Sequence, residues 1–231
     1  MPTIDQNIAQ VQKRIDRAVA AAQRRKPPKL LAVSKTQTAA TIRMAYQAGQ
    51  IAFGENYLQE AIDKQSQLTD CAIEWHFIGP IQSNKTRAIA ERFSWVHSVS
   101  RIKIAQRLSA QRPEALSSLN ICIQVNLDDE IGKEGVTLAE VPAFAEKISS
   151  LPRLKLRGLM AIPEPRDVVQ EQQQSFLRLT HALSKLQRQL PQAPLDTLSM
   201  GMSNDLEAAI AAGATIVRIG TALFGAREEH K

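Results

Sequence analysis

Apolar residues near the start of the chain recur at helical spacing. They alternate in steps of four and three residues, at Ile4, Ile8, Val11, Ile15, Ala18 and Ala22. A stripe with this period covers one face of an α-helix. The helix must end before Pro27 and Pro28, because proline lacks the backbone N–H that a continuing helix needs. The pattern therefore predicts an N-terminal helix ahead of the rest of the fold.

After this helix, short apolar runs alternate with longer stretches of helical periodicity. The runs predict strands over residues 29–33, 51–53, 74–78, 94–99, 120–125, 155–160, 195–200 and 215–219. The stretches between them predict helices over residues 38–48, 57–68, 84–92, 101–111, 138–149, 168–190 and 204–212, with a short helical tail after Ala222. A strand followed by a helix, repeated eight times, is typical of parallel α/β folds.

Two α/β architectures fit this alternation. One is the (β/α)8 TIM barrel, whose usual length of roughly 250 residues is close to that of this chain. The other is an open doubly wound sheet, but no GxGxxG motif follows the first predicted strand. We expect the barrel, as a single domain over residues 1–231, because no Gly-, Pro- and Ser-rich stretch separates two halves. We expect the N-terminal helix to cover the closed bottom of this barrel.

Composition and charge narrow the possible functions. Hydrophobic residues make up 44% and charged residues 23%, which excludes a disordered or fibrous chain. The net charge is +6, but the excess is scattered, and its densest spot is Arg24, Arg25 and Lys26. Nucleic-acid binders usually concentrate charge on one face together with stacking aromatics, and aromatics are only 4% here. The composition thus argues against nucleic acid and suits a phosphorylated small molecule.

Cysteines and histidines give no indication of a metal site. Cys71 and Cys122 lie far apart without CxxC spacing, and no pair of histidines has the spacing of metal ligands. No apolar run approaches the about 18 residues of a membrane span, and the chain does not start with a signal peptide. We expect a cytoplasmic protein with no metal and no membrane association.

The residues that follow the predicted strands are the candidates for chemistry, since barrels place their active sites at the carboxyl ends of the strands. Alternation puts Leu31, Val33 and Lys35 on one face, so the lysine projects into the mouth if the two apolar residues point inward. A desolvated lysine there has a lowered pKa and can form a Schiff base. The alternative is a solvated lysine at a strand end.

The next two strand ends carry further polar residues. Gly54 permits close backbone approach, while Glu55 and Asn56 either bond a ring hydroxyl or cap the following helix. His76 stands in an apolar strand, and such a histidine is more often a satisfied core residue than a catalyst.

The last two turns have the composition of a phosphate site. Barrels commonly bind phosphate there with backbone N–H groups and hydroxyls. Ser203 and Thr221 supply hydroxyls, and Gly201 and Gly220 remove side chains that would obstruct an anion, although Ser203 could also be a simple helix cap. Arg218 shares a face with Ile216 and Gly220, and a buried arginine needs an acceptor.

These features together describe a site for an aldehyde that carries a phosphate. A lysine follows the first strand, phosphate-binding turns follow the seventh and eighth, and an arginine points inward. Pyridoxal 5'-phosphate (PLP) satisfies all three requirements.

Several long strings also resemble one known family. The chain is similar along nearly its whole length to the pyridoxal phosphate homeostasis proteins (the YggS/PROSC family), its cyanobacterial members in particular. The strings that carry this resemblance are LLAVSKTQ, FGENYLQE, WHFIGPIQSNK, IQVNLDDEIGKEGV, RGLMAIP, LSMGMSNDLEAAI and VRIGTALFG.

The resemblance implies a monomeric barrel of PLP fold type III, like the N-terminal domain of alanine racemase. It implies the cofactor as a Schiff base on Lys35, with Arg218 near the pyridine nitrogen. It further implies ring contacts from Asn56 and Met160, and phosphate contacts from Ser203, Gly220 and Thr221. Two positions depart from the family pattern: Pro80 stands where many members carry histidine, and Glu134 where serine is common.

Whether a second base stands opposite the lysine distinguishes an enzyme from a carrier. Arginine stays protonated, so beside the pyridine nitrogen it weakens the ring as an electron sink. A racemase tolerates this only if a second base stands opposite the lysine. The tyrosines are Tyr46, which lies in mid-helix, and Tyr57, which is a poor candidate for this second base. The chain also ends soon after the eighth strand, without the second domain of alanine racemase.

We therefore expect a carrier without catalytic residues, which buffers PLP, delivers it to apo-enzymes, and so contributes to PLP homeostasis and to amino-acid and keto-acid balance. A weak or unidentified fold-type-III enzyme, such as an amino-acid racemase, is the alternative. A third hypothesis is an interaction protein that acts through Arg24, Arg25 and Lys26.

Overall fold

The computed structural model describes residues 3–225 and forms a closed barrel of parallel strands in sequence order. The strands are β1 (Lys29–Val33), β2 (Ala52–Glu55), β3 (Glu74–Phe77), β4 (Trp95–Val99), β5 (Leu119–Val125), β6 (Leu154–Ala161), β7 (Thr197–Ser199) and β8 (Ile216–Ile219). This confirms the predicted (β/α)8 barrel and excludes the open doubly wound sheet, because β8 pairs with β1. The predicted tail after Ala222 and the predicted domain of residues 1–231 extend outside the described residues.

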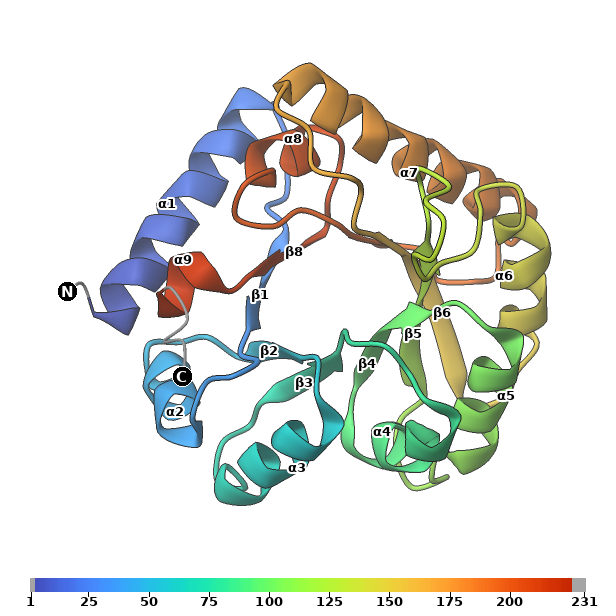
Figure 1. The fold of residues 1–231 in the computed structure, drawn as a ribbon, viewed down its shortest axis with the longest axis horizontal. Coiled ribbons are helices and arrows are strands. Elements are labelled where there is room, and N and C mark those ends of the chain that lie inside the picture. Colours follow the sequence, from blue (N-terminus) through green and yellow to red (C-terminus); the bar gives the residue numbers. More distant parts are fainter. Residues whose placement is uncertain (1–2, 226–231) are drawn as a thin grey trace.

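Helices surround the strands as an outer ring (Figure 1). They are α1 (Ile4–Ala21), α2 (Ala39–Gln47), α3 (Leu58–Gln67), α4 (Thr86–Arg92), α5 (Ile102–Gln111), α6 (Val141–Ser149), α7 (Val169–Gln189), α8 (Leu206–Ala211) and α9 (Thr221–Phe224), with a 3-10 turn at Ser83–Lys85. In the described part of the chain no helix has both the length and the apolar composition to cross a membrane.

The strands divide the apolar side chains into two layers. Residues such as Ala32, Phe53 and Val217 belong to the large cluster between the strands and the helices. A small separate cluster fills the inside of the barrel, and its members are Leu31, Ala52, Trp95, Cys122, Met160 and Ile216. Alternate residues of each strand therefore face the barrel interior, which places Leu31 inward as its strand pattern predicts.

The position of α1 differs from the prediction. It does not cover the barrel bottom but lies in the outer ring beside α8 and α9 (Figure 1). Asn7 donates its side-chain amide to the Leu223 carbonyl at 2.9 Å, and Arg14 bonds Glu207 of α8 through two hydrogen bonds. The reason is the length of α9, which has four residues and is too short to cover the outside of β8 and β1. The apolar stripe of α1 takes that place.

Closure of the barrel brings the first and the last strand together. Leu31 of β1 stands in register with Arg218 of β8, and Val33 with Gly54 of β2. Because the strands are parallel, the segments after β1, β2 and β8 all emerge at the same end of the barrel. Residues that lie far apart in the sequence thus become neighbours at the barrel mouth.

Candidate functional site

A cavity of about 590 Å³ opens at the carboxyl ends of the strands. All seven residues predicted to contact the cofactor line it: Lys35, Asn56, Met160, Ser203, Arg218, Gly220 and Thr221. The remaining lining residues are Arg14, Val33, Ile78, Ile162, Met202, Asn204 and Ala222. The structure therefore brings together in one place residues that the sequence analysis collected from five separate segments.

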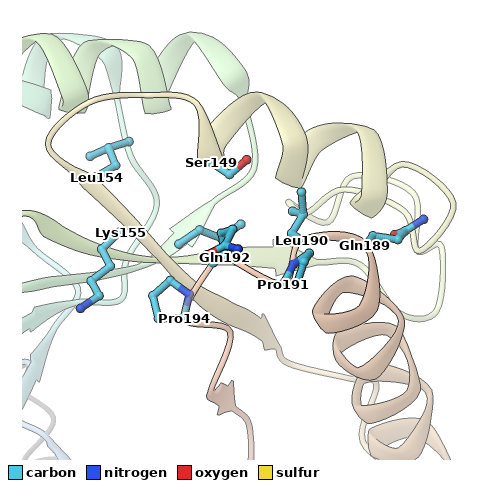
Figure 2. Close-up of a pocket in the computed structure, with 10 residues that line it drawn as sticks. Ser149, Leu154, Lys155, Gln189, Leu190, Pro191, Gln192 and Pro194 are labelled. Atoms are coloured by element: carbon cyan, nitrogen blue, oxygen red, sulfur yellow. The ribbon is translucent and has the colours of Figure 1, made fainter.

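A second cavity, of about 440 Å³, lies at the opposite end of β6 (Figure 2). Leu154 and Lys155 at the start of β6 form one wall, and the loop with Leu190, Pro191 and Pro194 forms another. None of the predicted site residues lines it. The candidate chemistry is thus confined to the barrel mouth.

The turn that carries Lys35 is fixed from both sides. Ser34 donates its backbone N–H to the carbonyl of Gly54 at 3.0 Å, and Thr36 donates its N–H to the Glu60 carboxylate at 2.6 Å. Thr36 has a φ of 66°, a left-handed conformation that a β-branched residue rarely adopts. Lys35 is half-buried between these two anchored residues. Lys35 therefore belongs to the cavity wall at the barrel mouth.

Glu55 lies in a buried ion cluster behind this turn. Its carboxylate accepts hydrogen bonds from Ser34 Oγ at 2.6 Å and from Lys64 Nζ at 2.8 Å, and Lys64 also donates to the Ser34 carbonyl at 2.7 Å. Burial raises the pKa of Glu55, while Lys64 and Ser34 oppose that rise. Glu55 neither caps α3 nor lines the cavity, so both predicted roles are wrong for it. It holds the backbone next to Lys35 in place.

Asn56 faces the cavity with an unsatisfied acceptor. Its Oδ1 atom is buried and has no hydrogen-bond partner among the described residues. The N-terminal cap position of α3 is Tyr57, so Asn56 is not the helix cap. A buried carbonyl oxygen without a donor costs roughly 1 to 3 kcal/mol. Asn56 therefore has an acceptor available for a hydroxyl group of a ligand.

The last two turns have glycines where side chains would collide. A Cβ at Gly201, whose φ is +95°, would lie 2.5 Å from Ala209 Cβ. A Cβ at Gly220 would lie 3.3 Å from the Val33 carbonyl oxygen. The cap residue of α8 is Asp205, which accepts the N–H of Met202, so Ser203 is not the cap. Its hydroxyl lies in the cavity wall instead.

Arg218 points into the barrel, as its alternation with Ile216 predicts, and its side chain is almost fully buried. Nη1 donates to the Ser199 carbonyl at 2.6 Å and to Ser199 Oγ at 2.9 Å, and Nη2 donates to the Ala161 carbonyl at 3.1 Å. Burial lowers the pKa of Arg218 to about 10, partly offset by Asp205. Arg218 therefore remains charged at neutral pH, although its hydrogen-bond acceptors are all neutral groups.

Charge around the cavity favours an anionic ligand. Three of its lining residues, Arg14, Lys35 and Arg218, are cationic side chains, and no carboxylate belongs to the lining in the described part of the chain. The guanidinium of Arg14 is paired with Glu207 at 2.5 Å. A ligand with a phosphate group and an aldehyde finds both counter-charge and an amine here.

Sequence reasoning missed some of the lining. Arg14 lies on α1, next to a residue of the predicted apolar stripe, and no local pattern links it to turns near the other end of the chain. Ile78 is the last residue of a predicted strand, and Ile162 and Met202 follow predicted strands, so positions at strand ends were the available signal. Residues 3–225 contain no group of three His, Cys, Asp or Glu side chains able to hold a metal ion.

The chain matches the family model of the alanine racemase N-terminal domain over residues 4–228. Pyridoxal phosphate homeostasis protein from Pseudomonas aeruginosa is 58% identical, over 99% of this chain and 97% of its own length. The protein of the same name from Escherichia coli K12 is 49% identical over the full length of both chains. These relatives match along their whole length, so the comparison covers fold and site alike.

Solved structures give the same result. PipY of Synechococcus elongatus, in its structure without PLP, superposes with a TM-score of 0.87 at 40% identity, covering 96% of this chain and 100% of PipY. The structure of PipY with PLP bound has a TM-score of 0.79 at 42% identity, covering 91% and 100%. Alanine racemase from Corynebacterium glutamicum shares the fold, with a TM-score of 0.70 at 19% identity, covering 97% of this chain and 61% of its own.

With the whole chain matched by relatives at up to 58% identity, the resemblance found in the sequence is confirmed, and the chain belongs to the family of pyridoxal phosphate homeostasis proteins.

Proposed function

We propose that this chain binds PLP reversibly in the cavity at the barrel mouth and contributes to PLP homeostasis and to amino-acid and keto-acid balance, without catalytic turnover. The observation that carries the proposal is the cavity itself, which combines a lysine, an inward arginine and two hydroxyl-bearing turns without a carboxylate in its described lining. The homeostasis proteins that the chain resembles, and the PLP-bound PipY structure, support the choice of ligand.

Each of the seven predicted site residues has a role in this proposal. PLP supplies an aldehyde, which a lysine amine holds reversibly as a Schiff base, and Lys35 is that lysine. Ser203, Gly220 and Thr221 hold the phosphate, and Arg218 donates toward the pyridine nitrogen. Asn56 offers its buried Oδ1 to the ring hydroxyl, and Met160 packs against the ring.

The absence of turnover rests on the missing second base. Neither tyrosine lines the cavity in the described structure: Tyr57 is mostly exposed, and Tyr46 accepts the N–H of Ala72 through its hydroxyl at 3.1 Å. Proton exchange on both faces of an amino acid needs two positioned bases. The relatives are named homeostasis proteins rather than enzymes, which fits this reading.

The proposal has further parts at the level of the cell. We propose that the chain acts as a single cofactor-binding domain and as a monomer. We further propose that it works in the cytoplasm and that apo-PLP enzymes receive the cofactor from it.

Absorption spectroscopy tests the covalent site. Purified protein with PLP should show a band near ~420 nm, which disappears in Lys35→Ala because that variant lacks the amine. Lys26→Ala, at an exposed position away from the cavity, is the matched control and should keep the band. Retention of the band in Lys35→Ala would contradict the assignment of the lysine.

A transfer assay then separates carrier from enzyme. Loaded protein should restore the activity of an apo-PLP enzyme, while free amino acids should remain unchanged in its presence. Sustained racemisation or transamination of any common amino acid by the purified chain would overturn the carrier proposal.

A further inference from the structure

A continuous chain of hydrogen bonds runs through the barrel interior behind Arg218. At its lower end, Glu74 Oε1 lies 2.6 Å from His76 Nε2 and 2.7 Å from Lys29 Nζ. His76 Nδ1 lies 2.8 Å from His97 Nε2, and His97 Nδ1 lies 2.7 Å from Ser199 Oγ. Ser199 Oγ in turn accepts from Arg218 Nη1 at 2.9 Å. The chain links the amino end of β3 to the cavity wall.

The middle of this chain is sealed from solvent. His76, His97 and Ser199 are fully buried, whereas Glu74 keeps about a third of its side chain exposed. The His76 ring stacks on Trp95 with an interplanar angle of 4° and a centroid distance of 5.3 Å. The geometry therefore leaves the rings little freedom to turn away from each other.

The charge of Glu74 determines which atom donates and which accepts in each hydrogen bond of the chain. Hydrogen bonds from His76 and Lys29 lower the pKa of Glu74 to about 2, so it is a carboxylate and can only accept. His76 Nε2 must then carry the proton. Burial lowers the pKa of His76, so the ring is neutral and its Nδ1 is an acceptor.

The same logic passes along the chain to the serine. Because His76 Nδ1 accepts, His97 Nε2 must donate, and burial lowers the pKa of His97 well below its usual value, which leaves Nδ1 as an acceptor. Ser199 therefore donates its only hydroxyl proton to His97, and its lone pairs face the guanidinium of Arg218. The opposite direction would set a bare His76 nitrogen against a carboxylate at 2.6 Å.

We propose that this polarised chain, from Glu74 to Ser199, is a positioning device for Arg218 at the cofactor site. The hydrogen-bond chain gives the buried guanidinium an acceptor, Ser199 Oγ, whose own proton is donated to His97. It also couples the charge of Glu74 to that acceptor. Arg218 then keeps its remaining N–H groups directed at the ligand. The inference rests on the proposed function, since the ligand that Arg218 faces is PLP.

Nitrogen-15 NMR of the histidine rings tests the direction of the chain without cofactor. His76 and His97 should both carry their proton on Nε2, in the cofactor-free and in the loaded protein. Glu74→Gln keeps an acceptor oxygen but removes the charge, so we expect the His76 ring to lose its single fixed tautomer. A proton on Nδ1 of either ring in the wild-type protein would overturn the proposal.

Binding measurements test the effect on the cofactor. Ser199→Ala removes the hydroxyl but leaves the backbone carbonyl that Arg218 also uses, so PLP affinity should fall about three- to tenfold, the size expected for loss of one ordinary hydrogen bond. The absorption band of the bound cofactor should shift as well, and Ser199→Thr, which keeps a hydroxyl, should restore the band and most of the affinity.

Ser98→Ala is the matched control. Ser98 is a buried serine of β4 whose hydroxyl donates to the Gly79 carbonyl and has no link to Arg218. Equal affinities and equal bands in Ser98→Ala and Ser199→Ala would overturn the inference. If the wild-type protein failed to bind PLP, the proposed function would be wrong. The histidine tautomers seen by NMR would still decide the direction of the hydrogen bonds from Glu74 to Ser199.

Discussion

Three adjacent basic residues, Arg24, Arg25 and Lys26, have different environments although the sequence presents them as one cluster. The guanidinium of Arg24 is partly buried and donates to the Ala214 carbonyl at 2.6 Å and to the Ile210 carbonyl at 3.2 Å. Burial also lowers the pKa of Arg24. Arg25 and Lys26 are exposed. The hypothesis of a basic interaction surface is thus left with two residues of the three.

This difference predicts different costs for the same substitution. Arg24→Ala should lower the free energy of unfolding by about 1 to 2 kcal/mol, because the carbonyl of Ile210 in α8 and that of Ala214 beyond its end each lose a donor. Arg25→Ala should change it by less than about 0.5 kcal/mol, as is usual for an exposed side chain. Urea denaturation of both variants measures this, and equal stabilities would contradict the assigned role of Arg24.

Single residues also show how far sequence reasoning reaches at the site. Lys35, Arg218 and the glycines could be predicted because strand alternation and strand ends are local patterns. The partners of those residues could not. His97 and Ser199 are 102 residues apart, and their contact depends on the register of strands that no local pattern encodes.

At the scale of elements, each strand was predicted, and β1 with its exact bounds, but the ends of the other strands were not. The seventh strand is predicted over residues 195–200, and the structure limits it to Thr197–Ser199. Leu195 is buried, so it belongs to the apolar run, but its N–H bonds the Ala193 carbonyl in a turn. Only the residues that face Gly158, Leu159 and Met160 pair as a strand. The apolar run indicates which residues are buried, whereas the ends of a strand depend on which residues of the neighbouring strand it pairs with.

The role of α1 as an outer-ring helix leads to a prediction for its apolar stripe. Ile15 is fully buried among the residues that α1 packs against the barrel. Ile15→Ala should lower the free energy of unfolding by about 2 to 5 kcal/mol, since it leaves a cavity under the helix. Lys13, which is exposed on the same helix, is the control, and Lys13→Ala should change stability by less than about 0.5 kcal/mol.

Thermal and urea denaturation of the two variants provide the measurement. A small loss in Ile15→Ala would mean that α1 is an accessory helix, and that the short α9 suffices to cover the barrel after all.

At the scale of the whole molecule, the buried histidines make the free energy of unfolding depend on pH. Burial lowers the pKa of His76 and His97 in the folded state below the usual value of 6.5. Below that pH the unfolded chain binds more protons than the folded one, so stability falls as the pH decreases. Glu74 has the depressed pKa of a carboxylate, about 2 against 4.5, so its contribution is full above pH 4.5 and is lost on further acidification.

We therefore expect stability to decline in two stages, from about pH 6.5 and again below about pH 4.5. His97→Gln should be less stable at pH 7 but should flatten the first stage by up to about 1.4 kcal/mol per pH unit, the contribution of one proton. Urea denaturation at a series of pH values tests this. His181→Gln, at an exposed position on α7, should leave the slope unchanged, and an unchanged slope in His97→Gln would refute the assignment.

The pairing of β1 with β8 has a consequence for protein synthesis. Lys35 leaves the ribosome long before Arg218, Gly220 and Thr221 are translated. A nascent chain thus exposes the lysine long before the turns that would retain a phosphate exist. Capture of an aldehyde by the lysine alone would then be weak and indiscriminate, and retention through a phosphate group could begin only when β8 has closed the barrel.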